Sequence, residues 1–122
     1  MHELGITQNI VGIVAEHSGG RPVKRVVLEI GTLAGVMADA IEFCFDVVAK
    51  GTALEGARLE IQRIEARAKC RSCGSEFMQQ TLFSACACGS RDVERLSGEE
   101  LKIKEYELDQ EYAVEAGSDA GL

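Results

Sequence analysis

The chain has 122 residues, enough for one compact domain or for a small core joined to a metal-held module. Apolar residues make up 46% and charged residues 27%, which is the composition of a folded soluble protein. The formal net charge of −7 argues against binding to nucleic acid or to anionic membrane surfaces. The sequence shows no signal peptide and no apolar run of transmembrane length, so we expect a cytoplasmic protein with reduced thiols.

Hydrophobic periodicity predicts two helices and three strands. Apolar residues recur every three or four positions over residues 4–18 and again over residues 38–50, as in amphipathic helices. Alternation predicts strands over residues 23–33, 57–68 and 100–108. The expected buried face of the first helix comprises Leu4, Ile6, Ile10, Ile13 and Val14, with His17 as a solvated or capping residue at its end.

These elements predict an α/β fold, with a small mixed sheet of about three strands, two helices and a zinc-ribbon-like module that contains four cysteines. We expect an α/β domain formed by residues 1–68 together with residues 99–110. Residues 69–98 form the cysteine module, and the last strand returns to the main sheet. Residues 111–122 are small, acidic and glycine-containing, so we expect a flexible tail there.

Two short cysteine pairs, Cys70/Cys73 and Cys86/Cys88, are separated by twelve residues. Two such pairs can meet as a tetrahedral shell of four thiolates, which suits zinc and also iron. A closed shell of this kind leaves no position for a substrate, so it indicates a structural site. Reduced metal-free thiols and a redox disulfide between Cys70 and Cys73 are the alternatives, and Cys44 is expected in the core.

His2 lies one residue from the amino terminus. Its imidazole and its own backbone nitrogen can close a chelate ring on a metal ion, and the Met1 amine or the Glu3 amide can add another nitrogen. Nitrogen-rich planar sets favour Ni(II) or Cu(II). A histidine in a frayed terminus is the alternative interpretation, because many chains carry one there.

The opening Met1-His2-Glu3-Leu4 and the cysteine pairs together resemble the HypA/HybF family of nickel-insertion proteins for [NiFe] hydrogenase maturation. The resemblance extends in order over about residues 1–108. It includes Val27-Leu28-Glu29-Ile30-Gly31, Leu33-Ala34-Gly35-Val36, Phe43-Cys44-Phe45-Asp46, Gly51-Thr52, Glu55-Gly56-Ala57, Cys88-Gly89-Ser90 and Gly98-Glu99-Glu100-Leu101-Lys102-Ile103.

The resemblance implies a metallochaperone and not an enzyme. It implies that transported Ni(II) is bound by the His2 side chain and nearby backbone nitrogens, with the Glu3 amide and the Met1 amine contributing. It implies a structural Zn(II) on Cys70, Cys73, Cys86 and Cys88. The implied partners are the GTPase HypB and the hydrogenase large-subunit precursor, with urease maturation proteins for some members.

The chain departs from the family pattern at two places. The second pair is normally C-P-x-C, whereas here it is Cys86-Ala87-Cys88, and Ala85 occupies the usual place of the first cysteine. Some members add a carboxylate to nickel from the segment that opens the second helix. Asp39 is the nearest acid, in an offset register, and is not assigned as a ligand.

Two other classes of protein fit the cysteine pairs alone. A non-enzymatic zinc-ribbon adaptor is the main alternative, although the acidic charge and the lack of a basic aromatic face weigh against nucleic acid as its partner. A rubredoxin-type iron protein is the other alternative, which visible colour distinguishes from zinc.

Overall fold

The computed structural model describes residues 2–109, so Met1 and the tail expected at residues 111–122 lie outside the described part of the chain. The backbone forms two compact units. Within the described range, the helical unit comprises residues 2–28, 36–61 and 103–109, and the cysteine unit comprises residues 29–35 and 62–102. No helix among residues 2–109 is both long and apolar enough to cross a membrane.

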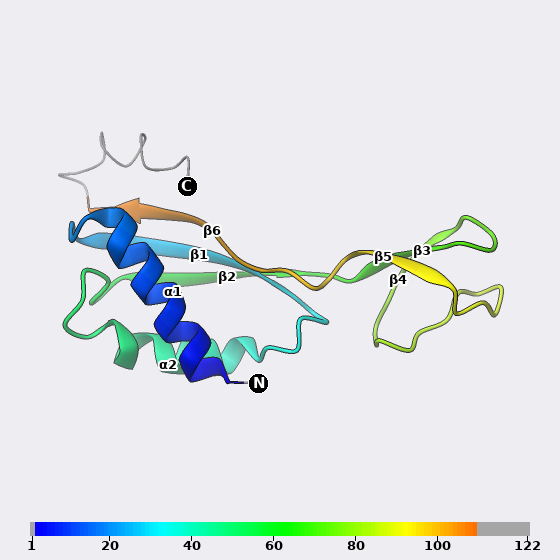
Figure 1. The fold of residues 1–122 in the computed structure, drawn as a ribbon, viewed down its shortest axis with the longest axis horizontal. Helices are drawn as coiled ribbons and strands as arrows, with labels where there is room; N and C mark the ends of the chain where they lie inside the picture. The colour runs from blue at the N-terminus through cyan, green and yellow to red at the C-terminus, as the bar shows by residue number, and fades with distance from the viewer. Residues whose placement is uncertain (1, 110–122) are drawn as a thin grey trace. The chain divides into compact units, whose positions relative to one another are not determined.

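The helical unit combines two helices with most of a three-stranded sheet (Figure 1). Strand order in this sheet is β2-β1-β6, and the C-terminal ends of β1 and β2 and the start of β6 belong to the cysteine unit. The elements are α1 (Glu3–Ser18), β1 (Val23–Gly31), α2 (Ala38–Ala49), β2 (Arg58–Ile64) and β6 (Leu101–Leu108).

Backbone hydrogen bonds at the ends of β1 set the strand directions. Asp109 N–H donates to Pro22 O at one end and Gly31 N–H donates to Glu100 O at the other, so β1 and β6 are antiparallel. Thr32 N–H donates to Ile64 O, and the chain enters β1 beside the segment that precedes β2, so these two strands are parallel. The prediction of a mixed three-stranded sheet with two helices is confirmed.

The buried face of α1 differs from the predicted one. Leu4 and Ile13 are about half exposed, at 52% and 46%, whereas Thr7 and Ser18 are completely buried. Both hydroxyls donate to helix carbonyls, Thr7 Oγ1 to Glu3 O at 2.7 Å and Ser18 Oγ to Ala15 O at 2.9 Å. Because both hydroxyls are hydrogen-bonded, their burial leaves no donor unsatisfied. The side of the helix that carries them is therefore buried in place of the side that carries Leu4 and Ile13. It contains Thr7, Ile10, Val11, Val14 and Ser18.

The core of the helical unit is mainly aliphatic, with two aromatic rings, those of Phe45 and Tyr106. The α2 face predicted to be apolar supplies Ile41 and Phe45, which are 0% and 2% exposed. Cys44, on the same helix, is half-buried and free. The sheet supplies Val26 and Leu28 from β1. Burial of these side chains is the principal stabilising contribution in this unit.

The cysteine unit contains a second three-stranded sheet, with order β4-β3-β5. Its strands are β3 (Arg67–Cys70), β4 (Glu76–Met78) and β5 (Val93–Ser97), and β3 pairs antiparallel with both neighbours. The single strand predicted over residues 57–68 is therefore wrong, because the chain forms β2 and then starts β3 after a break at residues 65 and 66.

A close approach of two glycines accompanies this break. A Cβ on Gly31 would overlap the backbone of Gly98, and a Cβ on Gly98 would overlap Ala66. Gly98 also has φ of +112°, a left-handed conformation that favours glycine. The Leu33 N–H donates to Gly98 O at 2.8 Å, which holds the two segments together. Side chains at positions 31 and 98 are therefore excluded by the close approach of the backbone.

Candidate metal centres

The four sulfur atoms of Cys70, Cys73, Cys86 and Cys88 lie within 4.8 Å of one another. Cys70 Sγ is 3.7 Å from Cys88 Sγ, and Cys73 Sγ is 3.5 Å from Cys86 Sγ. A Zn–S distance of about 2.3 Å gives a tetrahedron edge of roughly 3.8 Å, so these separations fit a tetrahedral metal. Among residues 2–109, this is the one such group of three or more His, Cys, Asp or Glu side chains.

Each cysteine pair lies on a turn that is closed by the same kind of backbone hydrogen bond. Gly74 N–H donates to Cys70 O at 2.8 Å, and Gly89 N–H donates to Cys86 O at 2.8 Å. Both glycines have positive φ, +80° and +91°, which allows these tight turns. The bond spans four residues in the first turn and three in the second. The Cys86-Ala87-Cys88 pair is therefore accommodated by a turn that is one residue shorter.

The two turns also share a pattern of burial. Cys70 and Cys86, the first cysteine of each pair, are buried, whereas Cys73 and Cys88 are exposed. A second closing bond repeats as well, since Cys70 N–H donates to Ser75 O and Cys86 N–H donates to Ser90 O. The cluster has one side toward the unit's interior and one side toward solvent. Sequence spacing alone did not indicate which cysteine of each pair would be buried.

A serine contact joins the two turns. Ser72 Oγ and Ser90 Oγ lie 3.0 Å apart, and Ser90 Oγ also accepts from Asp92 N–H at 3.1 Å. Arg71 adds an ion pair to Asp92 at 3.1 Å and a hydrogen bond to Val93 O at 2.9 Å. The turns are thus positioned by their own contacts. We did not predict these residues, because a serine between two cysteines has no sequence signal that distinguishes a bridge from an exposed side chain.

The two buried thiols of the cluster have pKa values shifted in opposite directions. A hydrogen bond from the Cys73 backbone N–H lowers the pKa of Cys70 to about 6. The pKa of Cys86 is raised to about 11: the Cys88 N–H favours its thiolate, but burial and the neighbouring sulfurs outweigh that effect. Four thiolates at these distances need a cation to balance their charge. A divalent metal with a preference for sulfur meets that need, so the donor set fits zinc.

The amino-terminal segment belongs to the helical unit. His2 is exposed and caps α1 with φ −85° and ψ 74°, and its carbonyl accepts from Ile6 N–H at 3.1 Å. The first four N–H groups of any α-helix lack an acceptor within the helix. A metal bound at the Glu3 amide nitrogen therefore replaces no helix hydrogen bond. The structure describes His2 and Glu3, whereas the Met1 amine lies outside the described residues.

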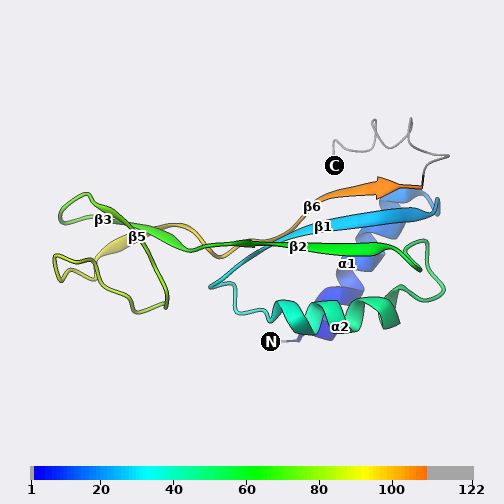
Figure 2. The ribbon, with the colours of Figure 1, turned by 180° about the vertical axis from the view of Figure 1, so that it is seen from behind.

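The Glu3 carboxylate links the beginnings of the two helices, which lie side by side in both ribbon views (Figures 1 and 2). Glu3 Oε2 accepts from the backbone N–H of Met37, the N-cap of α2, at 3.0 Å. This bond, with a smaller contribution from the residue's own N–H, lowers the pKa of Glu3. We predicted only the Glu3 backbone as a ligand and missed this side-chain contact, because it joins residues 34 positions apart.

Other candidate residues from the sequence lie on the helices. Asp39 is exposed in the first turn of α2, in the same helical unit as His2. His17 is exposed in the last turn of α1, as the prediction of a solvated residue requires. Cys44 lies in the helical unit, outside the four-cysteine cluster.

Comparisons with known proteins give the family. The family model described as "Hydrogenase/urease nickel incorporation, metallochaperone, hypA" matches residues 1–108. The chain is 58% identical over 111 residues to the hydrogenase maturation factor HypA of Rippkaea orientalis, covering 90% of this chain and 97% of that protein. It is 50% identical over 110 residues to the HypA of Geotalea uraniireducens, covering 89% of this chain and all of that protein.

Solved structures show the same fold at lower identity. The solution structure of the nickel metallochaperone HypA from Helicobacter pylori is 20% identical, with a TM-score of 0.61, and the match covers 88% of this chain and 97% of that one. A second HypA solution structure is 22% identical, with a TM-score of 0.63, over 89% and 97% of the two chains. The resemblance seen in the sequence is thus confirmed: this chain belongs to the HypA family of nickel-incorporation metallochaperones, which act in hydrogenase maturation.

Proposed function

We propose that this chain carries Ni(II) at its amino terminus and delivers it to the precursor of a [NiFe] hydrogenase large subunit in the cytoplasm. The exposed His2 at the start of α1, together with family membership, carries this proposal. The ligands are the His2 imidazole and backbone nitrogens, including the Glu3 amide and the Met1 amine. The chain acts as a carrier and not as an enzyme, with the GTPase HypB as a partner and urease maturation as a further destination.

The Glu3 contact supports this assignment. Because Glu3 Oε2 is held by Met37 N–H, the first turn of α1 has a fixed position against the start of α2. A metal ligand set built partly from backbone nitrogens needs a defined backbone conformation. Backbone amides must lose their protons to bind Ni(II), so metal affinity should rise with pH and release should be easy when a partner withdraws the terminus.

We assign the four-cysteine cluster to a structural Zn(II) held by Cys70, Cys73, Cys86 and Cys88. The sulfur separations and the charge of the thiolates support this choice. Iron has the same ligand preference. Metal analysis and the visible spectrum of the purified chain distinguish the two metals: zinc gives a colourless protein, and a coloured protein would show that the assignment is wrong.

The nickel site is tested by His2→Ala, with His17→Ala as a matched control on the chain's other histidine. Isothermal titration should show stoichiometric Ni(II) binding lost or strongly weakened in the first variant and unchanged in the second. Zinc content and circular dichroism should be unchanged in both, because neither residue lies in the four-cysteine cluster. Nickel binding by His2→Ala as tight as that of the parent chain would show that the amino-terminal assignment is wrong.

A further inference from the structure

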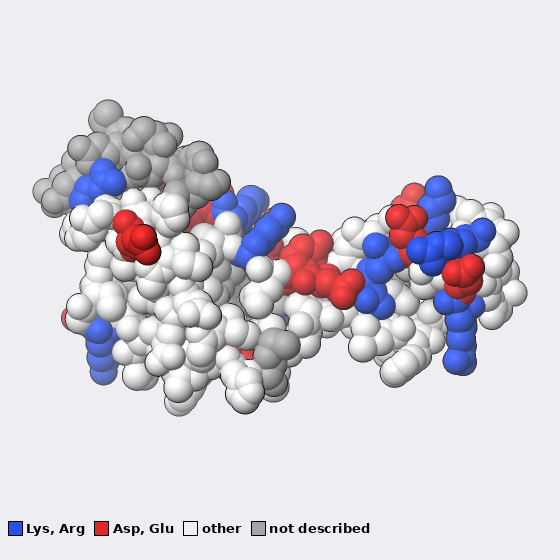
Figure 3. Space-filling view, in the orientation of Figure 1, with Lys and Arg blue, Asp and Glu red and all other residues white. Residues whose placement is uncertain are grey.

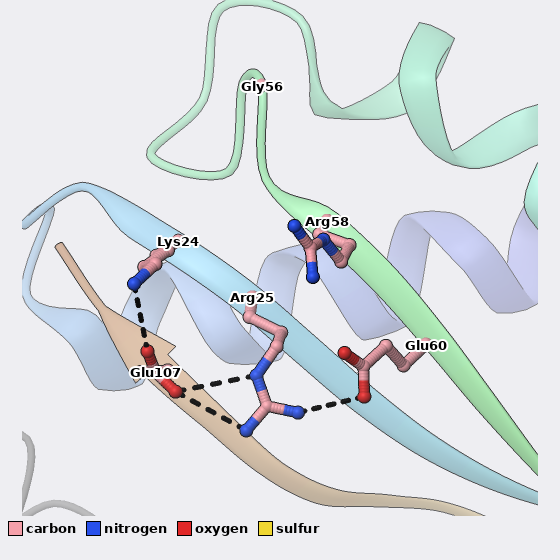
Figure 4. A pocket seen from close by; sticks show the side chains of 6 residues that line it. All are labelled: Lys24, Arg25, Gly56, Arg58, Glu60 and Glu107. Atoms are coloured by element: carbon pink, nitrogen blue, oxygen red, sulfur yellow. Dashed lines mark hydrogen bonds and ion pairs between the residues drawn. The ribbon is translucent and has the colours of Figure 1, made fainter.

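A notch lined by three basic side chains lies on the sheet of the helical unit, on the face turned away from α1 (Figure 4). Its volume is about 450 Å³, and it is open to solvent. Six residues from β1, β2, β6 and the turn before β2 line it: Lys24, Arg25, Gly56, Arg58, Glu60 and Glu107. All of them belong to the helical unit.

The notch is less acidic than the rest of the helical unit. The cysteine unit contains seven basic and seven acidic residues, whereas the described part of the helical unit contains six basic and ten acidic residues, a net charge of −4. The lining of the notch contains three cations and two carboxylates, and Glu105, which pairs with Arg25, brings a third carboxylate close to it. Within an acidic unit, a notch with balanced charges repels an anion less than its surroundings do.

Arg25 and its partners form the floor of the notch. The Arg25 guanidinium donates to Glu60 Oε2 at 2.9 Å and to Glu107 Oε2 at 3.3 Å, and it pairs with Glu105 at 3.3 Å. Although partial burial opposes it, Glu60 and then Glu107 raise the pKa of Arg25. Lys24 Nζ pairs with Glu107 Oε1 at 3.4 Å. These contacts make Arg25 a structural cation, already matched by carboxylates from both neighbouring strands.

Arg58 is different. No ion pair or hydrogen bond to its side chain is found among residues 2–109, and the residue is exposed. In Figure 4 its guanidinium extends from β2 toward the side where Lys24 and Arg25 lie. An arginine fork that keeps its donors available beside a cavity matches the two oxygens of a carboxylate.

The charges of the lining select among anions. Lys24 and Arg25 are already paired, so one carboxylate matches the single positive charge of Arg58. A phosphate dianion exceeds it and also faces repulsion from Glu60 and Glu107, which line the same notch. We propose that the notch formed by Lys24, Arg25, Arg58 and Gly56 is a binding site for a single carboxylate group. The group's source is either a free organic acid or an acidic side chain of a protein that docks on this face of the sheet.

The proposal is tested on the full-length, metal-loaded chain by nuclear magnetic resonance of the arginine Nε–Hε signals. Sodium acetate is titrated at constant ionic strength against sodium chloride. The Arg58 signal should shift saturably, with a dissociation constant on the order of 10 mM because the site is open and screened. A shift that is linear in acetate, or one that chloride reproduces, would overturn the proposal.

Variants separate the arginine fork from simple charge. Arg58→Gln should weaken acetate binding at least tenfold, read from the Lys24 and Gly56 amide shifts, and Arg58→Lys should fall in between. Arg91→Gln, an exposed arginine in the cysteine unit, is the matched control and should leave acetate binding unchanged. Equal acetate affinity of Arg58→Gln and the parent chain would show that the notch is not a site for carboxylate.

Two further probes identify the ligand. Inorganic phosphate at pH 7.5 should bind more weakly than acetate, and tighter phosphate binding would overturn the choice of a carboxylate. The capped peptide Ac-Ala-Glu-Ala-NH2 presents the same group on a peptide. Binding at least as tight as that of acetate supports a protein as the source, and weaker binding supports a free organic acid.

Discussion

The two units of this chain reach a folded state by different means. The helical unit buries aliphatic side chains from two helices and a sheet, with Phe45 and Leu28 at its centre. The cysteine unit buries few large apolar side chains: besides Ile30 and Gln79, its buried side chains are those of Ala66, Ala68 and two cysteines of the cluster. On the face shown in Figure 3, charged side chains cover much of the cysteine unit, whereas the helical unit is largely uncharged. Apolar burial stabilises the first unit, and a metal on the proposed four-cysteine site would stabilise the second.

Metal removal should separate the units most sharply. Chelation of the zinc should unfold residues 66–98, because binding to structural zinc sites supplies about 10–16 kcal/mol in small zinc modules. The helical unit should keep its amide signals in a heteronuclear spectrum, since its core contains no metal ligand. A cysteine unit whose signals stay dispersed after complete metal loss would contradict this comparison.

Single cysteine substitutions sharpen the same test. Cys86→Ser should lower zinc affinity by orders of magnitude, because it removes a buried thiolate ligand. Cys44→Ser is the matched control, since Cys44 lies outside the cluster. Competition with a zinc-binding dye measures the zinc affinity of each variant. Equal zinc affinity in the two variants would show that Cys86 is not a ligand.

A core substitution should break the other unit. Phe45→Ala should destabilise the helical unit by about 3–5 kcal/mol, because the ring is 2% exposed and its loss leaves a cavity. Phe43→Ala, two residues away at 81% exposure, should change stability by less than about 0.5 kcal/mol. Urea denaturation followed by circular dichroism measures both, and zinc stoichiometry should be unchanged. Similar losses for the two variants would place the core elsewhere.

A methyl group at the close approach of two glycines should have a moderate effect. Gly31→Ala would overlap the backbone of Gly98 and should destabilise the chain by about 1–3 kcal/mol. Gly12→Ala is the matched control within α1, where an added Cβ meets nothing within 4 Å. That change should stabilise the chain by about 0.5–1 kcal/mol, because alanine is the better helix former. Denaturation midpoints that move in the same direction would contradict the prediction.

The smallest expected effect concerns acid. Hydrogen bonding from Arg25, opposed slightly by burial and aided by Lys24, lowers the pKa of Glu107 below 4.5. The folded state therefore binds this proton less readily than the unfolded state. The stabilisation is fully present above pH 4.5 and is lost as the pH falls through the folded-state pKa. Glu107→Gln should make the loss of stability below pH 4.5 less steep, as measured by urea denaturation at several pH values. An unchanged dependence of the free energy of unfolding on pH below 4.5 would argue against the ion pair between Glu107 and Arg25.

The sequence was sufficient for the elements with strong periodicity. The α2 face was predicted through Ile41 and Phe45, because apolar residues there recur at helical spacing and a glycine follows the helix. The four-cysteine cluster was predicted from paired spacing alone. The shifted face of α1 was missed, because the buried hydroxyls of Thr7 and Ser18 count as polar in a pattern and become compatible with a core only through bonds to the helix backbone.

Contacts between distant residues had no local signal. The bond from Met37 N–H to the Glu3 carboxylate and the approach of Gly31 to Gly98 depend on the tertiary structure. The short strands of the cysteine unit were also missed, since three to five residues give too few positions for alternation. The sequence therefore did not predict the contacts that hold the start of α1 and the two cysteine turns in place.

The shorter of the two cysteine turns has a consequence for how the cluster is recognised in a sequence. Gly89 N–H closes the loop back to Cys86 just as Gly74 N–H does to Cys70, although the two loops differ in length by one residue. The feature that the two turns share is the closing bond and not the number of residues that it encloses. A comparison of cysteine spacings alone would therefore fail to identify Cys86 as the counterpart of Cys70.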